Sequence, residues 1–358
     1  MKTRIGVLTS GGDCPGLNAV LRGVVRAAAN RDWEVIGFHD GFEGLLHPPH
    51  SEVLDVRRTA GIMQSGGTIL GTTNRGHFVA KVADGAKARI PPEIIEQARV
   101  TLRDLGIHAL ITIGGDGSLT TALQLHEEGI AVVGVPKTID NDLEATAMTF
   151  GFDSAVACVA DALDRLHTTA SSHKRAMVIE VMGRHAGWIA LYGGLAGGAD
   201  IILIPELPFD YEKVADAVRR RDADRCLSTL IVVAEGACPQ AGHEQIRATG
   251  VGEYRLGGIG EIVAADISNR TGKETRTCVL GHLQRGGAPT TLDRILGTRF
   301  GVHAVELVAE QKFGQMVSYQ NYQVLSVPIA DAVHRIRLVP PEHQMVQTCR
   351  AMAISFGD

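Results

Sequence analysis

The hydrophobic positions of this chain fall into two patterns that alternate along most of its length. In the first, short apolar runs rich in valine and isoleucine are bounded by glycine, polar or charged residues. Such runs predict strands buried on both faces of a sheet, because a half-exposed strand would alternate apolar and polar residues. The runs are 4–10, 34–38, 108–113, 131–136, 176–183, 200–205, 228–236 and 276–282.

The second pattern lies between these runs, where apolar residues return at intervals of three and four, as on one face of a helix. Examples are Leu17, Val20, Leu21, Val24, Val25 and Ala28, and then Val156, Val159, Ala160, Leu163 and Leu166. Strands alternating with helices are typical of parallel, doubly wound sheets, whose ligands bind at the carboxyl ends of strands. We therefore expect an α/β fold with its functional residues in strand-to-helix turns.

The length of 358 residues exceeds one typical domain and favours two lobes. Each is expected to be a doubly wound, mainly parallel, Rossmann-like sheet covered by helices. No proline- or serine-rich linker separates the lobes, so the boundary is placed in the segment 136–153, where a new helix begins near Asp153.

The net charge of −5 provides no overall positive field for nucleic acid or an anionic membrane. A bound phosphate must therefore meet locally placed cations, and the partner is expected to be small. No apolar run approaches the roughly 18 residues that a membrane helix needs. Six cysteines lack close pairs and metal-type spacing, which favours reduced thiols and a cytoplasmic protein. They stand at positions 14, 158, 226, 238, 278 and 349.

Two turns share the order strand, Gly-Gly-Asp, small residues, helix: VLTSGGDCPGLNAV at 7–20 and ITIGGDGSLTTAL at 111–123. Glycines let a phosphate approach the backbone, and the start of a helix favours its negative charge. A carboxylate such as Asp116 fits beside phosphates when Mg²⁺ lies between them. The alternative is a tight turn whose aspartate caps the next helix. Neither turn has the P-loop or GxGxxG pattern.

The segment PKTIDNDL at 136–143 follows another strand and places Asp140 and Asp142 two residues apart. A loop carboxylate can accept the proton of an attacking hydroxyl, while a second acid helps to hold a metal ion. We assign Asp140 as the base, and the alternative is a turn rich in aspartate and asparagine.

The second half of the chain places cations near the ends of predicted strands and helices. They are Arg175, Arg184, Arg276, His282 and Arg285. Guanidinium groups suit a phosphate monoester, and Glu235 suits sugar hydroxyls, so the expected acceptor is a phosphorylated sugar. The alternative is that each arginine is a solvated surface charge.

Together these motifs resemble the 6-phosphofructokinases. GVLTSGGDCPGLNAVLRGVVR, GGDGS, PKTIDND, SSHKR, EVMGRHAGW and ETRTCVLGHLQRGG follow the order and spacing of that family from residue 4 to about 300. The match is to the mixed-substrate group of the bacterial phosphofructokinase A family, which has Gly-Asp-Gly and Pro-Lys-Thr-Ile-Asp motifs. It implies a glycolytic kinase that transfers the γ-phosphoryl of ATP to the 1-hydroxyl of fructose 6-phosphate, giving fructose 1,6-bisphosphate and ADP.

The resemblance implies roles for single residues. Donor-binding residues are Gly12, Asn74, Arg75, Gly115, Asp116, Gly117 and Ser118, with Mg²⁺ on Asp116 and Asp142. Catalytic residues are Asp140 as base, Thr138 and Arg184. Substrate-binding residues are Thr138, Ile139, Asp140, Met182, Gly183, Arg184, Glu235, His282, Leu283, Gln284 and Arg285 of one subunit, with Arg175 and Arg276 of a neighbour. That sharing implies a homotetramer or homodimer.

The resemblance also implies which lobe binds which substrate. Residues 1–150 with roughly 285–335 would form the lobe for nucleotide and magnesium. Residues 151–284 with roughly 336–358 would form the lobe for the sugar phosphate. The tail from about Lys312 lies outside the specific motifs and suggests no function of its own.

Two positions bear on the phosphoryl donor. In the family, glycine at the position of Gly117 goes with ATP, whereas aspartate there leaves pyrophosphate as donor. Lys137 stands where strictly ATP-using bacterial enzymes have glycine, and it is usual in pyrophosphate users and in a mixed branch. We expect ATP, with a pyrophosphate-dependent phosphotransferase as the alternative.

Other hypotheses remain open at this point. Arg22 and Arg26 match effector-binding positions of some relatives, but His167 replaces a third effector arginine, so weak or absent control by phosphoenolpyruvate is expected. The acceptor could instead be NAD, a lipid, sedoheptulose 7-phosphate or tagatose 6-phosphate. A catalytically silent subunit that binds nucleotide or sugar phosphate is the alternative from another class.

Overall fold

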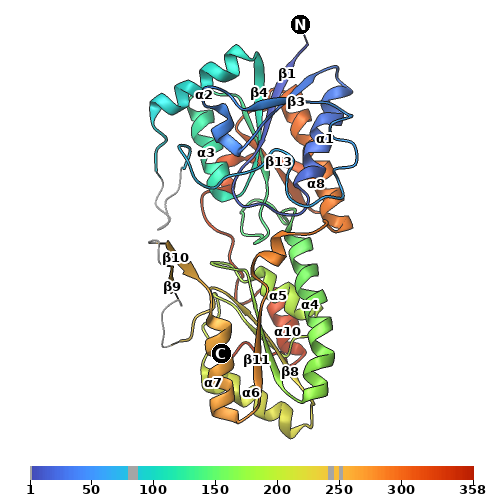
Figure 1. The fold of residues 1–358 in the computed structure, drawn as a ribbon, viewed down its shortest axis with the longest axis vertical. Coiled ribbons are helices and arrows are strands. Elements are labelled where there is room, and N and C mark those ends of the chain that lie inside the picture. Colours follow the sequence, from blue (N-terminus) through green and yellow to red (C-terminus); the bar gives the residue numbers. More distant parts are fainter. Residues whose placement is uncertain (1, 80–87, 241–245, 250–252) are drawn as a thin grey trace. The chain divides into compact units, whose positions relative to one another are not determined.

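The computed structural model describes residues 2–79, 88–240, 246–249 and 253–358 (Figure 1). The chain divides into two compact units, each built from three stretches of sequence. The first unit comprises Met1–Ile139, Leu143–Ser154 and Arg285–Arg335. The second comprises Asp140–Asp142, Ala155–Gln284 and Ile336–Asp358.

The first unit is built around a seven-stranded sheet in the order β13-β12-β5-β4-β1-β2-β3. The strands are β1 (Arg4–Thr9), β2 (Glu34–Phe38), β3 (Ser51–Leu54), β4 (Ile107–Gly114), β5 (Val132–Pro136), β12 (Gln315–Gln320) and β13 (Gln323–Pro328). The five inner strands pair in parallel, and β3 and β13 close the two edges in antiparallel fashion. The carboxyl ends of β1, β4 and β5 therefore meet at one edge of the sheet.

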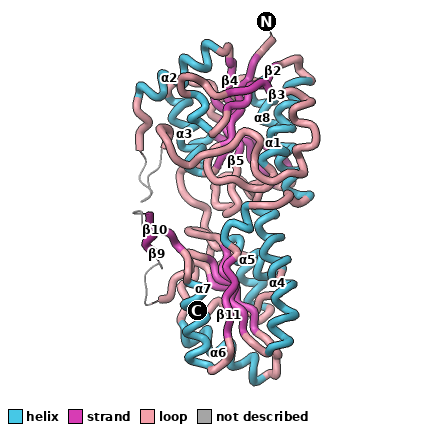
Figure 2. The backbone as a smooth tube through the Cα atoms, viewed as in Figure 1, coloured by secondary structure: helices cyan, strands magenta, loops and turns pink. Residues whose placement is uncertain are grey.

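Helices cover both faces of this sheet, as Figure 2 shows by colour. Helices α1 (Leu17–Ala29) and α8 (Thr291–Ala309) pack on one face, and α2 (Pro92–Asp104) and α3 (Asp116–Glu127) on the other (Figure 1). The short elements η1 (Gly41–Leu45) and α9 (Ile329–Ala332) complete the unit. Strand β5 is buried at every position, as expected for an inner strand between two helical layers.

The second unit has a four-stranded parallel sheet in the order β11-β6-β8-β7. Its strands are β6 (Ala176–Val181), β7 (Ile201–Leu203), β8 (Thr229–Ala234) and β11 (Thr275–Val279), with a separate hairpin of β9 (Ile246–Thr249) and β10 (Glu253–Leu256). Its helical elements are α4 (Phe152–His173), α5 (Trp188–Ala196), α6 (Tyr211–Ala223), α7 (Ile259–Thr271), η2 (Gly281–Arg285) and α10 (Gln344–Ala351), except that Phe152–Ser154 of α4 and Arg285 of η2 group with the first unit. Strands β6, β7 and β8 are fully buried, whereas the edge strand β11 is only half-buried.

The C-terminal segment Ile336–Asp358 is an integral part of the second unit. Ser355 forms a bridge with Ile201 at the free edge of β7, and its carbonyl oxygen accepts the N–H of Ile202 at 2.9 Å. Phe356 is 1% exposed, and burial of such a side chain contributes roughly 1.5–3 kcal/mol to stability. Across the ranges described, no helix combines the length and apolar character needed to cross a membrane.

Candidate active site

The first glycine turn connects β1 to α1 and lies at the carboxyl edge of the first unit's sheet. The N–H of Ser10 donates to Ile113 at 2.9 Å, so the turn starts beside the end of β4. Gly11 has a φ of 83°, a left-handed conformation that favours glycine. Its N–H donates to the carbonyl of Thr73 at 2.9 Å, and Asn74 and Arg75 directly follow Thr73 in the chain.

The second glycine turn connects β4 to α3, and Gly115 precedes the first residue of the helix. Asp116 is half-buried in the first turn of α3, where the N-terminal end of a helix favours negative charge. Gly117 is exposed, and a Cβ added to it would have no atom within 4 Å. Ser118 is 8% exposed, and a Cβ on Gly11 would lie 3.2 Å from its Oγ, so the two turns adjoin.

Lys137 connects the ends of three neighbouring strands. It follows β5, and its N–H donates to the carbonyl of Gly114 at 2.9 Å. Its side chain is 4% exposed, and the ammonium group donates to the carbonyl oxygen of Gly12. A buried ammonium therefore lies directly against the backbone of the first glycine turn. The next residue, Thr138, is held through its carbonyl by the Thr149 hydroxyl at 2.7 Å.

Arg285 belongs to the first unit, at the same glycine turn. Its Nη1 donates to the carbonyl oxygen of Asp13 at 3.1 Å, and a Cβ on Gly12 would lie 2.9 Å from that nitrogen. The thiol of Cys14 lies in this turn as well, and burial raises its pKa to about 12. Cys14 is therefore a neutral thiol at physiological pH and serves as core filler rather than as a nucleophile.

The segment Asp140–Asp142 groups with the second unit. Asn141 is 3% exposed and has a φ of 52°, a left-handed conformation that asparagine tolerates better than most residues. Asp140 and Asp142 on either side of it are half-buried. The carbonyl of Asp142 accepts the N–H of Arg337 at 2.8 Å. Ile139, just before this segment, is fully buried in the first unit.

Three neighbouring strands of the second unit end in predicted substrate residues. Met182, Gly183 and Arg184 follow β6, Glu235 follows β8, and His282 follows β11. Backbone bonds join two of these turns, since the N–H of Gly236 donates to Gly183 at 3.1 Å and that of Glu235 donates to Val181 at 2.8 Å. A Cβ on Gly236 would collide with the carbonyl of Arg184, so glycine permits this close approach.

Gln284 and Leu283 occupy contrasting environments in η2. Gln284 is fully buried, and its Oε1 accepts the N–H of Met182 at 3.3 Å, so its side chain supports the turn after β6. Leu283 is 68% exposed. The contacts of Gln284 are thus internal, whereas Leu283 presents an apolar side chain to solvent.

Arg175 and Arg276 lie at the opposite end of the same sheet. Arg175 directly precedes β6, and Arg276 pairs with Met177 near the start of that strand. Because a strand rises about 3.3 Å per residue, Arg175 and Met182 are separated by about 20 Å along β6. One carboxylate oxygen of Glu274 pairs with both guanidinium groups, at 3.0 Å for Arg175 and 2.7 Å for Arg276. These two arginines therefore do not join Arg184 and His282 within one chain.

Glu180 is a buried acidic residue with no role predicted from the sequence. It is 4% exposed on β6, and its carboxylate accepts the N–H groups of Gly258 and Gly260 at 2.8–3.0 Å, at the start of α7. The helix dipole favours an anion there. An acid inside the apolar run AMVIEVMG was the sequence signal that could have revealed this helix-capping role.

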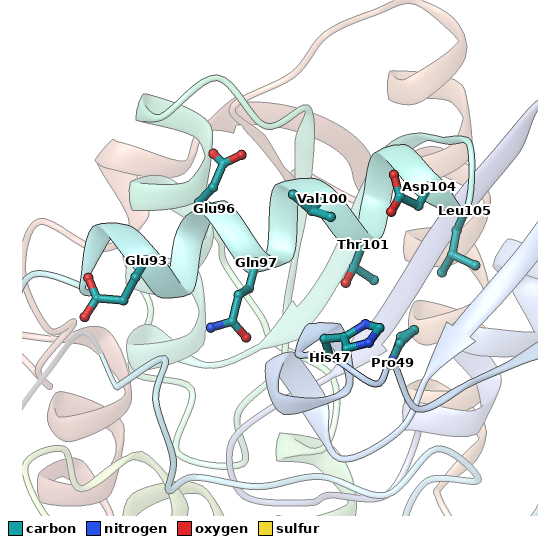
Figure 3. Close-up of a pocket in the computed structure, with 9 residues that line it drawn as sticks. All are labelled: His47, Pro49, Glu93, Glu96, Gln97, Val100, Thr101, Asp104 and Leu105. Atoms are coloured by element: carbon teal, nitrogen blue, oxygen red, sulfur yellow. The ribbon is translucent and has the colours of Figure 1, made fainter.

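A pocket of about 480 Å³ lies between α2 and residues 47–49 of the first unit (Figure 3). Gln97 and Thr101 of α2 and Leu105 directly after it line the pocket opposite His47 and Pro49. None of the residues that the sequence assigns to donor or sugar phosphate lines this pocket. Most of the predicted site residues instead follow the carboxyl ends of strands in the two sheets, whereas Arg175 and Arg276 lie at the opposite end of the second sheet.

Parallel sheets whose strands end in glycine-rich and basic turns define an α/β protein of the type that binds phosphorylated ligands. A family model described as Phosphofructokinase matches residues 4–308. An ATP-dependent 6-phosphofructokinase from Chloroflexus aggregans is 52% identical over 357 residues, covering 100% of this chain and 98% of the relative. The chain belongs to the phosphofructokinase family and is an enzyme of phosphoryl transfer, which confirms the family and fold class expected from the sequence.

Two further comparisons show a similar relative that is named for a different phosphoryl donor and a solved structure with the same fold. A pyrophosphate–fructose 6-phosphate 1-phosphotransferase from Amycolatopsis methanolica is 51% identical over 344 residues, covering 95% of this chain and 97% of that protein. The solved phosphofructokinase of Saccharomyces cerevisiae has a TM-score of 0.80 and 32% identity, covering 99% of this chain. This chain spans 47% of the yeast chain.

Proposed function

We propose that this chain transfers the γ-phosphoryl group of ATP to the 1-hydroxyl of fructose 6-phosphate, giving fructose 1,6-bisphosphate and ADP. Similar relatives differ in the donor, since one at 52% identity is named as ATP-dependent and one at 51% as a pyrophosphate enzyme. Overall identity therefore does not select the donor. The observation that supports ATP as the donor is the open space beside Gly117, where an added Cβ would have no atom within 4 Å.

The first unit supplies the donor site. Its two adjoining glycine turns give a polyphosphate access to backbone, and the start of α3 favours negative charge. The buried ammonium of Lys137 adds a positive charge beside the first turn. Asn74 and Arg75 lie next to this turn and are assigned to the nucleotide. An open Gly117 leaves room for the α-phosphate that distinguishes ATP from pyrophosphate.

Magnesium fits the acids of this chain, with Asp116 and Asp142 as its proposed protein ligands. The described residues contain no group of three or more His, Cys, Asp or Glu that could hold a metal ion. Mg²⁺ usually takes one or two carboxylates and completes its shell with water and substrate phosphates, so the half-buried Asp116 and Asp142 suit it. Bound Mg²⁺ would neutralise charge on the transferring phosphoryl group.

Asp140 is the proposed base, and it accepts the proton of the sugar 1-hydroxyl during attack on the γ-phosphorus. The left-handed Asn141 turns the backbone between the two acids of this segment. Thr138 precedes the segment and is held through its carbonyl. Such positioning matters because phosphoryl transfer depends mainly on orientation and charge stabilisation.

The second unit supplies the sugar-phosphate site. Met182, Gly183 and Arg184, with Glu235 and His282, follow three adjacent parallel strands, so the cations can meet a phosphate and Glu235 the sugar hydroxyls. Gln284 supports this site through Met182. Ile139, Leu283 and Arg285 retain their assignment to the substrate from the family resemblance.

We assign Arg175 and Arg276 to the site of a neighbouring subunit. They lie at the opposite end of the sheet from Arg184 and His282, so they cannot complete the same site within one chain. Strand β11 is an edge strand with Val279 52% exposed, and a second copy of the chain would cover it. The proposal is therefore a homotetramer or homodimer with shared sites. A glycolytic role in the cytoplasm stays a prediction.

A side-by-side assay tests the donor and acceptor together. Purified protein is supplied with fructose 6-phosphate and Mg²⁺, and with either ATP or pyrophosphate, while fructose 1,6-bisphosphate is measured. We expect product with ATP. If product forms with pyrophosphate and not with ATP, Lys137 rather than Gly117 determines which donor the enzyme uses. No product with either donor would favour a silent binding subunit, and product from a different phosphorylated sugar would reassign the acceptor.

A further inference from the structure

The proposed base segment is held from the C-terminal part of the chain. Asp140–Asp142 groups with the second unit, and the N–H of Arg337 donates to the carbonyl oxygen of Asp142 at 2.8 Å. Arg337 stands at the beginning of Ile336–Asp358, for which sequence alone suggested no function. This backbone hydrogen bond fixes the position of the segment that bears Asp140 within the second unit.

Trp188 anchors Arg337 in two ways. The indole Nε1 donates to the carbonyl oxygen of Arg337 at 2.9 Å. The guanidinium carbon of Arg337 lies 4.7 Å from the centroid of the same ring, which is within the range of a cation–π interaction. Trp188 is 1% exposed and packs edge-on against His343 at 5.1 Å. The ring therefore has a fixed orientation, and Arg337 is bound to it by both its backbone and its side chain.

A second connection joins the same two regions of the chain. The Glu206 carboxylate accepts the N–H of Gly187 at 3.0 and 3.1 Å and the N–H of Val339 at 2.8 Å. Two contacts therefore connect the start of α5 to residues 337–339. One is the hydrogen bond from the Trp188 indole to Arg337, and the other is the Glu206 carboxylate, which bridges the N–H groups of Gly187 and Val339. Because α5 follows the turn of Met182, Gly183 and Arg184, these contacts connect the sugar-phosphate turn to the base segment.

We propose that Trp188 and Arg337 are positioning residues that set the Asp140 carboxylate against the sugar hydroxyl. This inference depends on the proposed function, in which Asp140 is the base. A base must approach its proton within hydrogen-bond reach, and a displacement of about 1 Å can cost up to about 100-fold in rate. Loss of the anchor should therefore slow the chemical step and leave substrate affinity nearly unchanged.

Substitutions at Arg337 test the inference. Arg337→Ala removes the cation above Trp188, and we expect kcat to fall about tenfold while KM for either substrate changes less than about twofold. Arg337→Lys restores a cation over the ring and should recover most of kcat. Trp188→Phe keeps an aromatic ring but loses the indole N–H, and an intermediate kcat is expected.

A matched control lies in the same segment. Arg350 stacks over Phe356 at 5.2 Å, so Arg350→Ala removes a cation–π contact that does not involve residues 140–142. It should leave kcat unchanged. Hydrogen exchange of the unliganded protein gives a readout independent of activity, and amides at 140–142 and 337 should exchange faster in Arg337→Ala and not in Arg350→Ala.

The outcomes separate this inference from the proposed function. Wild-type protein that turns over no sugar phosphate would overturn the function. An active wild type whose kcat and exchange rates survive Arg337→Ala would overturn only the positioning role. So would a kcat loss explained by a matching loss of folded protein in thermal unfolding, or an Arg337→Lys variant as slow as Arg337→Ala.

Discussion

The ammonium group of Lys137 donates a hydrogen bond to the carbonyl oxygen of Gly12, 125 residues earlier in the chain. This contact joins the end of β5 to the first glycine turn across the end of β4. Lys137 is 4% exposed, so its ammonium group is largely removed from water and the Gly12 carbonyl replaces part of its hydration. The side chain thus fixes the shape of the glycine turn in addition to its proposed influence on the donor.

Lys137→Ala should lower the free energy of unfolding by about 1–3 kcal/mol, because it leaves the carbonyl of Gly12 without this donor. Chemical denaturation followed by circular dichroism measures the change. Lys312→Ala removes an exposed lysine paired with Glu310 and should cost less than about 0.5 kcal/mol. Equal effects of the two substitutions would show that the buried bond does not stabilise the turn.

Gly117→Asp should reduce kcat/KM for ATP by roughly 10- to 100-fold and leave the unfolding temperature nearly unchanged. The space around this position accepts a side chain, whereas a new carboxylate repels the nearby phosphates by about 1.4–2.7 kcal/mol, which corresponds to this loss. Gly117→Asn has nearly the same size without the charge and should lose less. Assays with both donors would reveal any gain with pyrophosphate, and unchanged ATP kinetics in the aspartate variant would contradict the donor proposal.

Asp140→Asn should lower kcat by roughly 100-fold or more while the protein remains folded, as expected when a general base is removed. Steady-state kinetics and thermal unfolding of the same preparation test both parts. Asp224→Asn, at an exposed position after α6, serves as the control and should keep full activity. Near-normal turnover in Asp140→Asn would remove this residue from the mechanism.

Subunit mixing tests the assignment of Arg175 to a neighbour. Arg175→Ala and Arg184→Ala should each raise KM for fructose 6-phosphate strongly, since each loses a phosphate contact. After the two variants are dissociated and reassembled together, some sites should regain both arginines, and activity should rise above that of either variant alone. A mixture no more active than its components would contradict the assignment of Arg175 to a neighbour's site.

Asp293 should make stability depend on pH. Burial raises its pKa to about 6, and its carboxylate accepts the Ser154 N–H at 2.8 Å and hydroxyl at 2.6 Å. The folded protein binds the proton more tightly than the unfolded chain, so the contribution of Asp293 falls as pH rises from about 4 to about 6, by up to about 3 kcal/mol. Above about pH 6, the destabilisation caused by the buried, ionised Asp293 no longer changes with pH.

Asp293→Asn cannot ionise, and its unfolding free energy should lack this decline. Urea denaturation of both proteins at several pH values between about 4.5 and 7 gives the difference curve. We expect the variant to gain stability relative to the wild type as pH rises. A difference that does not change with pH would mean that Asp293 has an ordinary pKa in the folded protein.

Most inner strands could be predicted from sequence because they are buried on both faces and read as continuous apolar runs. The inner strand β12 and the antiparallel edge strands β3 and β13 escaped prediction, since polar or exposed positions interrupt the apolar run in each. The bridge from Ser355 to β7 has no local periodic signal at all. Tertiary packing, rather than local pattern, determines these elements.

The glycine turns could be located because their function needs particular residue types in adjacent positions. Contacts between distant segments could not be predicted from the sequence. Nothing in the spacing of PKTIDNDL shows that the Lys137 ammonium reaches the carbonyl of Gly12, or that the N–H of Arg337 donates to the carbonyl of Asp142. The separation of Arg175 from Arg184 also became clear only when the two were placed at opposite ends of β6. Donor choice, metal ligation and sharing of sites stay predictions.

The interleaved course of the chain through its two units has a consequence for biosynthesis. The first unit needs residues 285–335 for α8, β12 and β13, and the second needs residues 336–358 to cover the edge of β7. Neither core can close on the ribosome while these residues are still inside the exit tunnel. Nascent chains should therefore expose apolar strand edges until residues 336–358 have left the exit tunnel.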